Sequence, residues 1–191
     1  FDPHVELLFQ TRPGHFTGAD RQLLTGSNPL DVAAADLDGD GDMDLVAVTD
    51  ANGPVSAGDV MMFFQSDALD FSPSIALLSP EGPEHIAAAD LDGDGDTDLV
   101  STNQNDSLTL YFQTSAGVFN LSPERLITGS QPREVVAADL DQDGNIDLVS
   151  VNALDSNLTP FFQTSPGVFT PAAAPLATGA FPISLDAADL D

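Results

Sequence analysis

The stretch Asp36-Leu37-Asp38-Gly39-Asp40-Gly41-Asp42-Met43-Asp44 decides the fold of this chain, because close copies of it recur along the sequence. The second copy spans residues 90–98, the third spans residues 139–147, and residues 189–191 repeat the first three positions. Successive copies start 54, 49 and 50 residues apart. A period of about 50 residues is typical of propeller blades rather than of helical repeats. The sequence therefore predicts one structural unit that is used several times.

Each repeat also contains four short apolar segments bounded by Gly, Pro, Asn and Asp, which predicts four β-strands and no helices. We name these expected strands A to D in chain order. In the second repeat, strand A covers residues 86–89 before the Asp-rich loop, and strand B opens at Leu99 directly after it. Strand C ends at Gln113, and strand D opens at Phe119 after a Gly-containing turn. Four strands per repeat at this period indicate a propeller blade.

The predicted fold is an all-β β-propeller with about four four-stranded blades in this chain. We expect a single repeat array over residues 1–191. Its expected parts are residues 1–27 (strands C and D of a closing blade), 28–80, 81–129 and 130–178 (complete blades), and 179–191 (strand A of a closing blade). Three alternatives stay open for the ring. Its two ends share one closing blade, the chain belongs to a larger ring, or a neighbouring chain completes it.

The Asp-rich loops have the donor pattern of a cation site. Asp at positions 1, 3, 5 and 9 supplies carboxylate oxygens, Gly at position 6 permits a sharp turn, and position 7 offers its backbone carbonyl. All-oxygen donor sets of this size favour Ca²⁺, since Mg²⁺ demands stricter octahedral geometry and zinc or copper prefers nitrogen or sulfur. An EF-hand is excluded, because position 12 lacks the required Glu and both flanks are predicted strands.

We therefore predict three complete Ca²⁺ sites and a partial fourth. The expected ligands are Asp36, Asp38, Asp40, Asp42 and Asp44 in the first loop, Asp90, Asp92, Asp94, Asp96 and Asp98 in the second, Asp139, Asp141, Asp143, Asn145 and Asp147 in the third, and Asp189 and Asp191 in the fourth. Gln142 replaces Gly at position 4 of the third loop. Because this position supplies no ligand, we expect the change to be tolerated.

The loops and their flanks resemble the FG-GAP or VCBS-type repeats of integrin α-chain propellers and many secreted bacterial proteins. The matching segments read Ala-Asp-Leu-Asp-Gly-Asp-Gly-Asp-x-Asp-Leu-Val at residues 35–46 and 89–100, and Ala-Asp-Leu-Asp-Gln-Asp-Gly-Asn-Ile-Asp-Leu-Val at residues 138–149. The resemblance covers essentially the whole chain. It implies a β-propeller with Ca²⁺ in hairpin loops at the periphery of the ring. Rings of this family usually have seven blades, and this chain departs from that number by holding about four units.

The amino-acid composition of the chain excludes several classes of partner. The chain carries 31 Asp and Glu against 4 Lys and Arg, a formal charge of −27. A basic patch for nucleic acid or anionic lipid is therefore absent from the sequence, and no apolar stretch approaches the ~20 residues that cross a bilayer. We expect no nucleic-acid partner and no membrane insertion. The chain has no cysteine, which excludes disulfides, zinc–thiolate sites and a cysteine nucleophile.

The leading functional expectation is a non-enzymatic, calcium-stabilised structural or adhesion module outside the cell or at its surface. Extracellular Ca²⁺ modules work at about 10⁻⁴–10⁻³ M. The expected partners are further copies of the chain, in a ring or filament, or another protein. No catalytic residue is predicted, because His4, His15 and His85 form no spaced cluster and the Glu residues are scattered. The third alternative, a propeller domain of a secreted enzyme, has the least support.

The second alternative is a carbohydrate-binding, lectin-like propeller with glycans as partners. Aromatic residues recur at the end of each strand C and could stack on sugars, but their regular spacing favours a role in the core between blades. They are Phe63, Phe64, Tyr111, Phe112, Phe161 and Phe162. Three sequons mark candidate glycosylation sites at Asn105, Asn120 and Asn157, although such triplets often arise by chance.

Overall fold

The computed structural model describes residues 3–50, 58–67, 70–72, 75–79 and 82–188. Within these ranges the chain is all-β and contains no helix, so none of the described residues forms a helix that could cross a membrane. The strands are β1 (His4–Arg12), β2 (His15–Leu24), β3 (Pro29–Ala35), β4 (Asp44–Thr49), β5 (Asp59–Phe63), β6 (Gln65–Asp67), β7 (Asp70–Phe71), β8 (Ile75–Leu78), β9 (Pro83–Ala89), β10 (Asp98–Asn103), β11 (Ser107–Ser115), β12 (Val118–Ile127), β13 (Pro132–Ala138), β14 (Asp147–Asn152), β15 (Asn157–Ser165), β16 (Val168–Pro171) and β17 (Leu176–Ala177).

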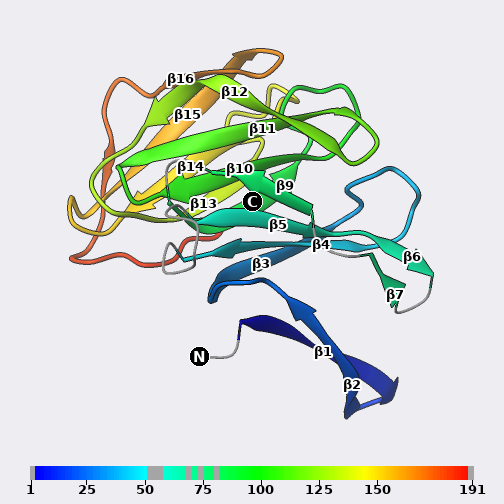
Figure 1. The fold of residues 1–191 in the computed structure, drawn as a ribbon. Coiled ribbons are helices and arrows are strands. Elements are labelled where there is room, and N and C mark those ends of the chain that lie inside the picture. The colour runs from blue at the N-terminus through cyan, green and yellow to red at the C-terminus, as the bar shows by residue number, and fades with distance from the viewer. Residues whose placement is uncertain (1–2, 51–57, 68–69, 73–74, 80–81, 189–191) are drawn as a thin grey trace.

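The strands form successive antiparallel sheets, which we call units. Unit 1 has the order β3-β4-β5-β8, unit 2 the order β9-β10-β11-β12, and unit 3 the order β13-β14-β15-β16 with β17 also beside β15. The strands β1 and β2 form a separate hairpin, and β6 and β7 form a second small one. Figure 1 shows the β1–β2 hairpin at one end of the chain and unit 3 at the other. The all-β class predicted from the sequence is confirmed.

The same register repeats in all three units. The Leu that opens strand B pairs with an aromatic residue of strand C. The pairs are Leu45–Phe63, Leu99–Tyr111 and Leu148–Phe161. The β1–β2 hairpin has the register of strands C and D, because Gln10 pairs with Phe16 as Gln113 pairs with Phe119. Equivalent positions in different units can therefore be compared directly.

The hydrophobic core lies between successive units. Side chains alternate along each strand, so one face of a unit looks toward the next unit and the other toward the previous one. We call these the forward face and the rear face. In unit 1, Val46 and Val48 lie on the forward face, whereas Ala47 lies on the rear face against the β1–β2 hairpin. Three such clusters hold the hairpin and the three units together.

The two clusters between complete units use equivalent positions. Between units 1 and 2, the forward face of unit 1 contributes Leu37, Val46, Val48, Val60 and Met62. The rear face of unit 2 contributes Ile86, Leu99, Tyr111 and Phe119. Between units 2 and 3, the forward face of unit 2 contributes Leu91, Val100, Leu108, Leu110 and Leu126. The rear face of unit 3 contributes Val135, Leu148, Phe161 and Phe169. Aromatic residues of strands C and D thus fill the space between units, as their periodic spacing predicts.

Polar contacts link the first strands of neighbouring units. The N–H of Ile86 donates to the Asp31 carboxylate at 3.0 Å. His85 also lies between two carboxylates, with its Nε2 at 3.3 Å from Asp31 and 3.8 Å from Glu134. The sequence did not indicate this contact, because the three residues lie about one repeat apart.

The expected final strand A is not a strand over its described residues, 179–188. The segment nevertheless lies where a strand A is expected. The N–H of Leu185 donates to the Glu134 carboxylate at 2.6 Å, and this contact matches the one between the N–H of Ile86 and Asp31 in the preceding pair of units. A strand is defined by its ladder of hydrogen bonds. Among the described residues no strand B lies beside this segment, which explains the difference.

Candidate metal centre

Each Asp-rich loop winds around its first carboxylate. Both oxygens of Asp36 accept backbone hydrogen bonds, one from the N–H of Gly39 at 2.7 Å and one from that of Gly41 at 3.0 Å. The two glycines have φ angles of +77° and +92°, in the left-handed region that Gly adopts at little cost. The loop sequence therefore turns tightly enough to bring position 5 back toward position 1.

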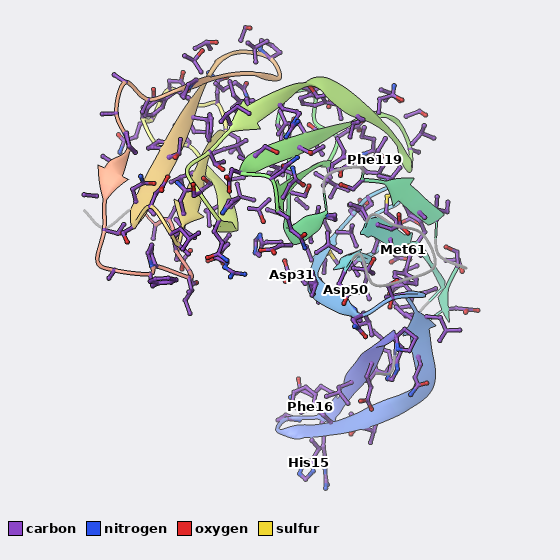
Figure 2. All side chains as sticks on the ribbon, turned by 60° about the vertical axis from the view of Figure 1, so that its left-hand side comes forward. His15, Phe16, Asp31, Asp50, Met61 and Phe119 are labelled. Atoms are coloured by element: carbon purple, nitrogen blue, oxygen red, sulfur yellow. The ribbon has the colours of Figure 1, made fainter. Side chains whose placement is uncertain are left out.

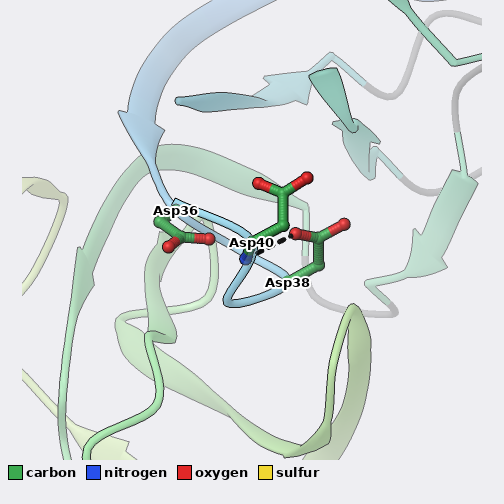
Figure 3. A group of neighbouring side chains, drawn as sticks. All are labelled: Asp36, Asp38 and Asp40. Atoms are coloured by element: carbon green, nitrogen blue, oxygen red, sulfur yellow. Dashed lines mark hydrogen bonds between the residues drawn. The ribbon is translucent and has the colours of Figure 1, made fainter. Parts of the chain in front are cut away.

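The next two carboxylates fix the remaining turns. Asp38 accepts from the N–H of Asp40 at 3.2 Å, and Asp40 accepts from the N–H of Asp42 at 2.8 Å. One oxygen each from Asp36, Asp38 and Asp40 lies within 4.8 Å of the others. Figure 3 shows the three carboxylates gathered over the loop. The second loop repeats this geometry with Asp90, Asp92 and Asp94.

The Asp at position 9 has a different environment. Asp98 is 0 % exposed, and its two oxygens accept from the backbone N–H groups of Leu91 and Gln113, each at 2.8 Å. It therefore joins the loop to strand C of the same unit. Asp44 and Asp147 are equally buried and make the matching pair of contacts. Burial raises the pKa of Asp98 to about 6 and also raises that of Asp44.

The third loop departs from the other two. Its converging oxygens come from Asp139, Asp141 and Asp147, and position 5 is not among them. The reason is Asn145 at position 7, whose Nδ2 donates to both carboxylate oxygens of Asp143 at 2.9 Å. This contact holds Asp143 away from the group. Among the described residues, the third loop therefore gathers a different set of predicted ligands from the first two loops.

Position 4 of the third loop is also strained. Gln142 has a φ of +63°, where the first two loops have Gly at +77°. The residue supplies no ligand, as expected, but a side chain in the left-handed region costs about 1 kcal/mol. The backbone conformation at position 4 therefore favours Gly even though this position supplies no ligand.

The variant Gln142→Gly is expected to raise the free energy of unfolding by about 1 kcal/mol, because Gly removes this backbone strain. Chemical denaturation in the presence of a chelator would measure it. The matched control is Gly39→Gln, which should destabilise by a similar amount. A Cβ built at Gly39 meets no described atom within 4 Å, so its effect would come from the backbone alone. Equal stability of all three proteins would contradict the argument.

Each of the three groups of carboxylate oxygens could hold a hard cation. Desolvation raises the pKa of Asp92, with the neighbouring charge of Asp94 the next cause, and the pKa of Asp141 is raised in the same way. A bound divalent cation would relieve this repulsion. The groups contain only carboxylates, a donor set that suits Ca²⁺, Mg²⁺ or Mn²⁺ rather than zinc or copper.

Metal-free protein should lose stability as the pH rises from about 4 to about 6. The pKa of Asp98 is higher in the folded chain, about 6, than its ordinary value of 3.8. The folded chain therefore binds this proton more tightly than the unfolded chain, and the contribution to stability is lost as the pH passes through the folded pKa. Denaturation in chelator across this pH range would measure the slope. The control variant Asp98→Asn should flatten it, and an unchanged slope would contradict the assignment to Asp98.

The other predicted residues fall into three groups. Asp42, Asp96 and Asn145 at position 7 have exposed side chains, and the two carboxylates are not part of the converging groups. Asp189 and Asp191 lie outside the described residues. Of the sequons, Asn105 and Asn120 are exposed, whereas Asn157 is partly buried and accepts a hydrogen bond from Asn152.

Two positions that join the loop to the next unit are not evident from the ligand pattern: position 2 of the loop and the Gln at the end of strand C. Leu37 and Leu91, at position 2, are 0 % exposed and insert into the core shared with the next unit. Gln163 of unit 3 donates its Nε2 to the carbonyl of Leu91 at 2.6 Å. Each such loop is thus part of the contact between units. The recurrence of Leu at position 2 and of Gln at the end of strand C is the sequence feature that indicates these contacts.

Successive four-stranded antiparallel sheets, each with an Asp-rich loop between its first two strands, define a repeat protein with a β-propeller-like fold. Comparison with known families agrees, and the chain belongs to the FG-GAP-like repeat family, whose profile matches residues 2–47 and 90–150. A search among curated proteins gave no match.

Among the solved structures that are similar to this chain is one described as a functionally unknown protein from Desulfotomaculum acetoxidans DSM 771. The TM-score is 0.69 at 16 % sequence identity, with 95 % of this chain covered. At this identity the likeness concerns the fold alone. This chain spans 52 % of the length of that protein.

Proposed function

We propose that this chain is a calcium-stabilised, non-enzymatic structural or adhesion module of a β-propeller, working outside the cell or at its surface. One observation carries the proposal. The loop that gathers the carboxylates is the same loop that inserts Leu91 into the next unit and receives the hydrogen bond from Gln163. A cation that orders the loop would therefore order the contact between units.

Calcium is the proposed ion because of the number and kind of donors. Each loop offers several carboxylates at an exposed surface, which suits an ion with six to eight oxygen ligands and flexible geometry. Three such ions would leave the chain at a formal charge of about −21, still acidic enough to favour solubility. Exposed loops of this kind fit the millimolar calcium found outside cells, which supports the proposed location.

The alternative as a carbohydrate-binding propeller has less support. Phe63, Tyr111 and Phe161 are at most 2 % exposed and belong to the core between units. Phe64 and Phe112 pack partly buried against the same clusters. Most of the recurring aromatic residues are therefore not free to stack on a sugar. The described part of the chain likewise offers no nucleophile–base pair that would favour an enzyme.

Calcium removal tests the proposal. Each occupied site should add about 1.4 kcal/mol when free Ca²⁺ exceeds its dissociation constant tenfold, so chelator should lower the melting temperature and Ca²⁺ should restore it. Mg²⁺ at equal concentration is expected to restore less. The control is Asp94→Ala, which removes one converging carboxylate and should reduce the gain from Ca²⁺. An identical melting curve with and without Ca²⁺ would refute the proposal.

A further inference from the structure

The second and third Asp-rich loops, residues 90–98 and 139–147, are both bound by one buried side chain. Gln163, in strand C of unit 3, is 6 % exposed. Its Nε2 donates to the carbonyl of Leu91 in the second loop at 2.6 Å and to the carbonyl of Ile146 in the third loop at 3.1 Å. A carboxamide nitrogen carries two hydrogens, so one of them serves each loop. This group therefore joins loops that belong to different units.

Both carbonyls lie next to carboxylates that converge in their loops. Leu91 directly follows Asp90, one of the three converging carboxylates of the second loop. Ile146 directly precedes Asp147, which converges with two others in the third loop. The backbone N–H of Gln163 also donates to Asp147, at 2.9 Å. The backbone conformation of each loop at its carboxylates is therefore tied to the position of Gln163.

The turn that follows strand C in unit 3 makes a second contact with the second loop. Gly167 in this turn has a φ of +69°. A Cβ added there would lie 3.4 Å from the Cβ of Asp92 and 3.0 Å from the ring of Phe112, so the turn lies directly against a converging residue of the second loop. Figure 2 shows unit 3 beside unit 2, with side chains between their strands. Unit 3 thus contacts the second loop at positions 2 and 3.

The third loop is less prepared for a cation than the second. Asn145 donates to both carboxylate oxygens of Asp143 at 2.9 Å and holds this group away from the converging oxygens. The equivalent Asp94 converges with its neighbours in the second loop. We therefore expect the second loop to bind a cation more tightly, and the affinity of the third loop is the quantity in which an effect of its neighbour is measured.

We infer that Gln163 couples the cation sites of the second and third loops, so that binding in one strengthens binding in the other. The inference rests on the proposed function, because it requires that both loops bind a cation. Its physical cause is conformational entropy. An ordered second loop fixes the carbonyl of Leu91 and thereby the carboxamide of Gln163, so the third loop loses less freedom when it binds. Coupling between two binding sites is reciprocal, and Gln163 is a positioning residue for both.

Gln113 provides a comparison within the same fold. It holds the equivalent place in unit 2, where its Nε2 donates to the carbonyl of Thr97 at 3.1 Å and its Oε1 accepts from the N–H of Gly117 at 2.8 Å. Both partners belong to unit 2. Among the described residues, the carboxamide of Gln113 therefore joins no second Asp-rich loop, which makes it the matched control for Gln163.

A Ca²⁺ titration of the isotope-labelled 191-residue chain, followed by nuclear magnetic resonance, tests the coupling. The amide signals of Gly95 and Gly144 report the two loops separately, because each N–H donates to the first carboxylate of its own loop. The double variant Asp92→Asn, Asp94→Asn removes two of the three converging charges of the second loop and keeps their shape. The Ca²⁺ midpoint of the Gly144 signal should be about fivefold or more higher in this double variant than in wild type.

Replacement of Gln163 should abolish this difference. Gln163→Met keeps the approximate size of the side chain and removes both donors, and Gln163→Asn keeps the amide but is one methylene too short to reach both carbonyls. In either background the double variant should change the Gly144 midpoint by less than about twofold, whereas Gln113→Met should keep the wild-type ratio. A purely structural role of Gln163 would shift the midpoints of both loops and leave their ratio unchanged. Circular dichroism in chelator would verify that each variant folds.

Salt separates this effect from direct repulsion between the bound ions. At about 0.15 M salt the Debye length is about 8 Å, so repulsion between exposed charges in different loops is weak. The double variant also carries the same charge in the Gln163 and Gln113 backgrounds. A difference between the two backgrounds therefore reports the carboxamide of Gln163 and not the charge of the second loop.

The results also distinguish this inference from the proposed function. If neither glycine signal responds to Ca²⁺, the loops bind no calcium and both proposals are wrong. If both signals respond but the Gly144 midpoint is the same in wild type and in the double variant, calcium binds and only the coupling is wrong. If Gln163→Met and Gln163→Asn keep the wild-type ratio, the coupling acts through another contact, and the assignment to Gln163 is overturned.

Discussion

Replacement of Asp98 by Ala is expected to lower the free energy of unfolding by about 3–5 kcal/mol. The carboxylate is fully buried and accepts two backbone hydrogen bonds, from Leu91 and Gln113. Removing it leaves two buried N–H groups without a partner, and each such group costs about 1–3 kcal/mol. Urea denaturation in chelator would measure the loss. The effect should persist without metal, because it comes from hydrogen bonds within the protein.

The matched variant is Asp94→Ala in the same loop. Its carboxylate is exposed and converges with two others, so its removal relieves repulsion when no cation is bound. In chelator this variant should be as stable as wild type or slightly more so, and in Ca²⁺ it should lose the gain from the ion. If both variants lost stability only in Ca²⁺, Asp98 would be a ligand alone, contrary to the geometry.

Replacement of Leu91 by Ala should cost about 3–4 kcal/mol, within the range for fully buried leucines. The side chain is 0 % exposed and packs between units 2 and 3, so its truncation leaves a cavity at that contact. Leu140 is the control, because it holds the same loop position in unit 3 but is 37 % exposed. Leu140→Ala should cost less than about 1 kcal/mol.

The comparison separates a local role of position 2 from a role between units. Both leucines follow the first Asp of a similar loop, and among the described residues only Leu91 of the two packs against a next unit. A loss of equal size in the two variants would show that the residue stabilises its own loop and would contradict the role between units. Denaturant midpoints at a single low protein concentration are sufficient for this measurement.

The repeat and its strands could be predicted because the signals are local. Strand alternation and the spacing of Asp and Gly act over fewer than ten residues, as in the loop from Asp36 to Asp44. The turn around Asp36 follows from its own loop glycines. The burial of Tyr111 and Phe161 between units follows from their recurrence, since repeats share one continuous core.

The remaining features depend on contacts that are distant along the chain. Asp98 accepts from Gln113 in strand C, so its structural role is visible only once the strands are paired. The strain at Gln142 is a backbone property that ligand spacing does not reveal. In the third loop, one amide group of Asn145 redirects Asp143. The final strand A lacks a ladder because pairing needs a neighbour as well as a suitable sequence.

The repeated match of forward face to rear face bears on how such chains arise. A unit that fits its neighbour through the same positions each time also fits a duplicate of itself. Tandem duplication of the gene segment for one unit would therefore lengthen the array without requiring any new contact. Selection would then act on the two sides of each contact together, because Leu91 of one unit and Phe161 of the next share one core.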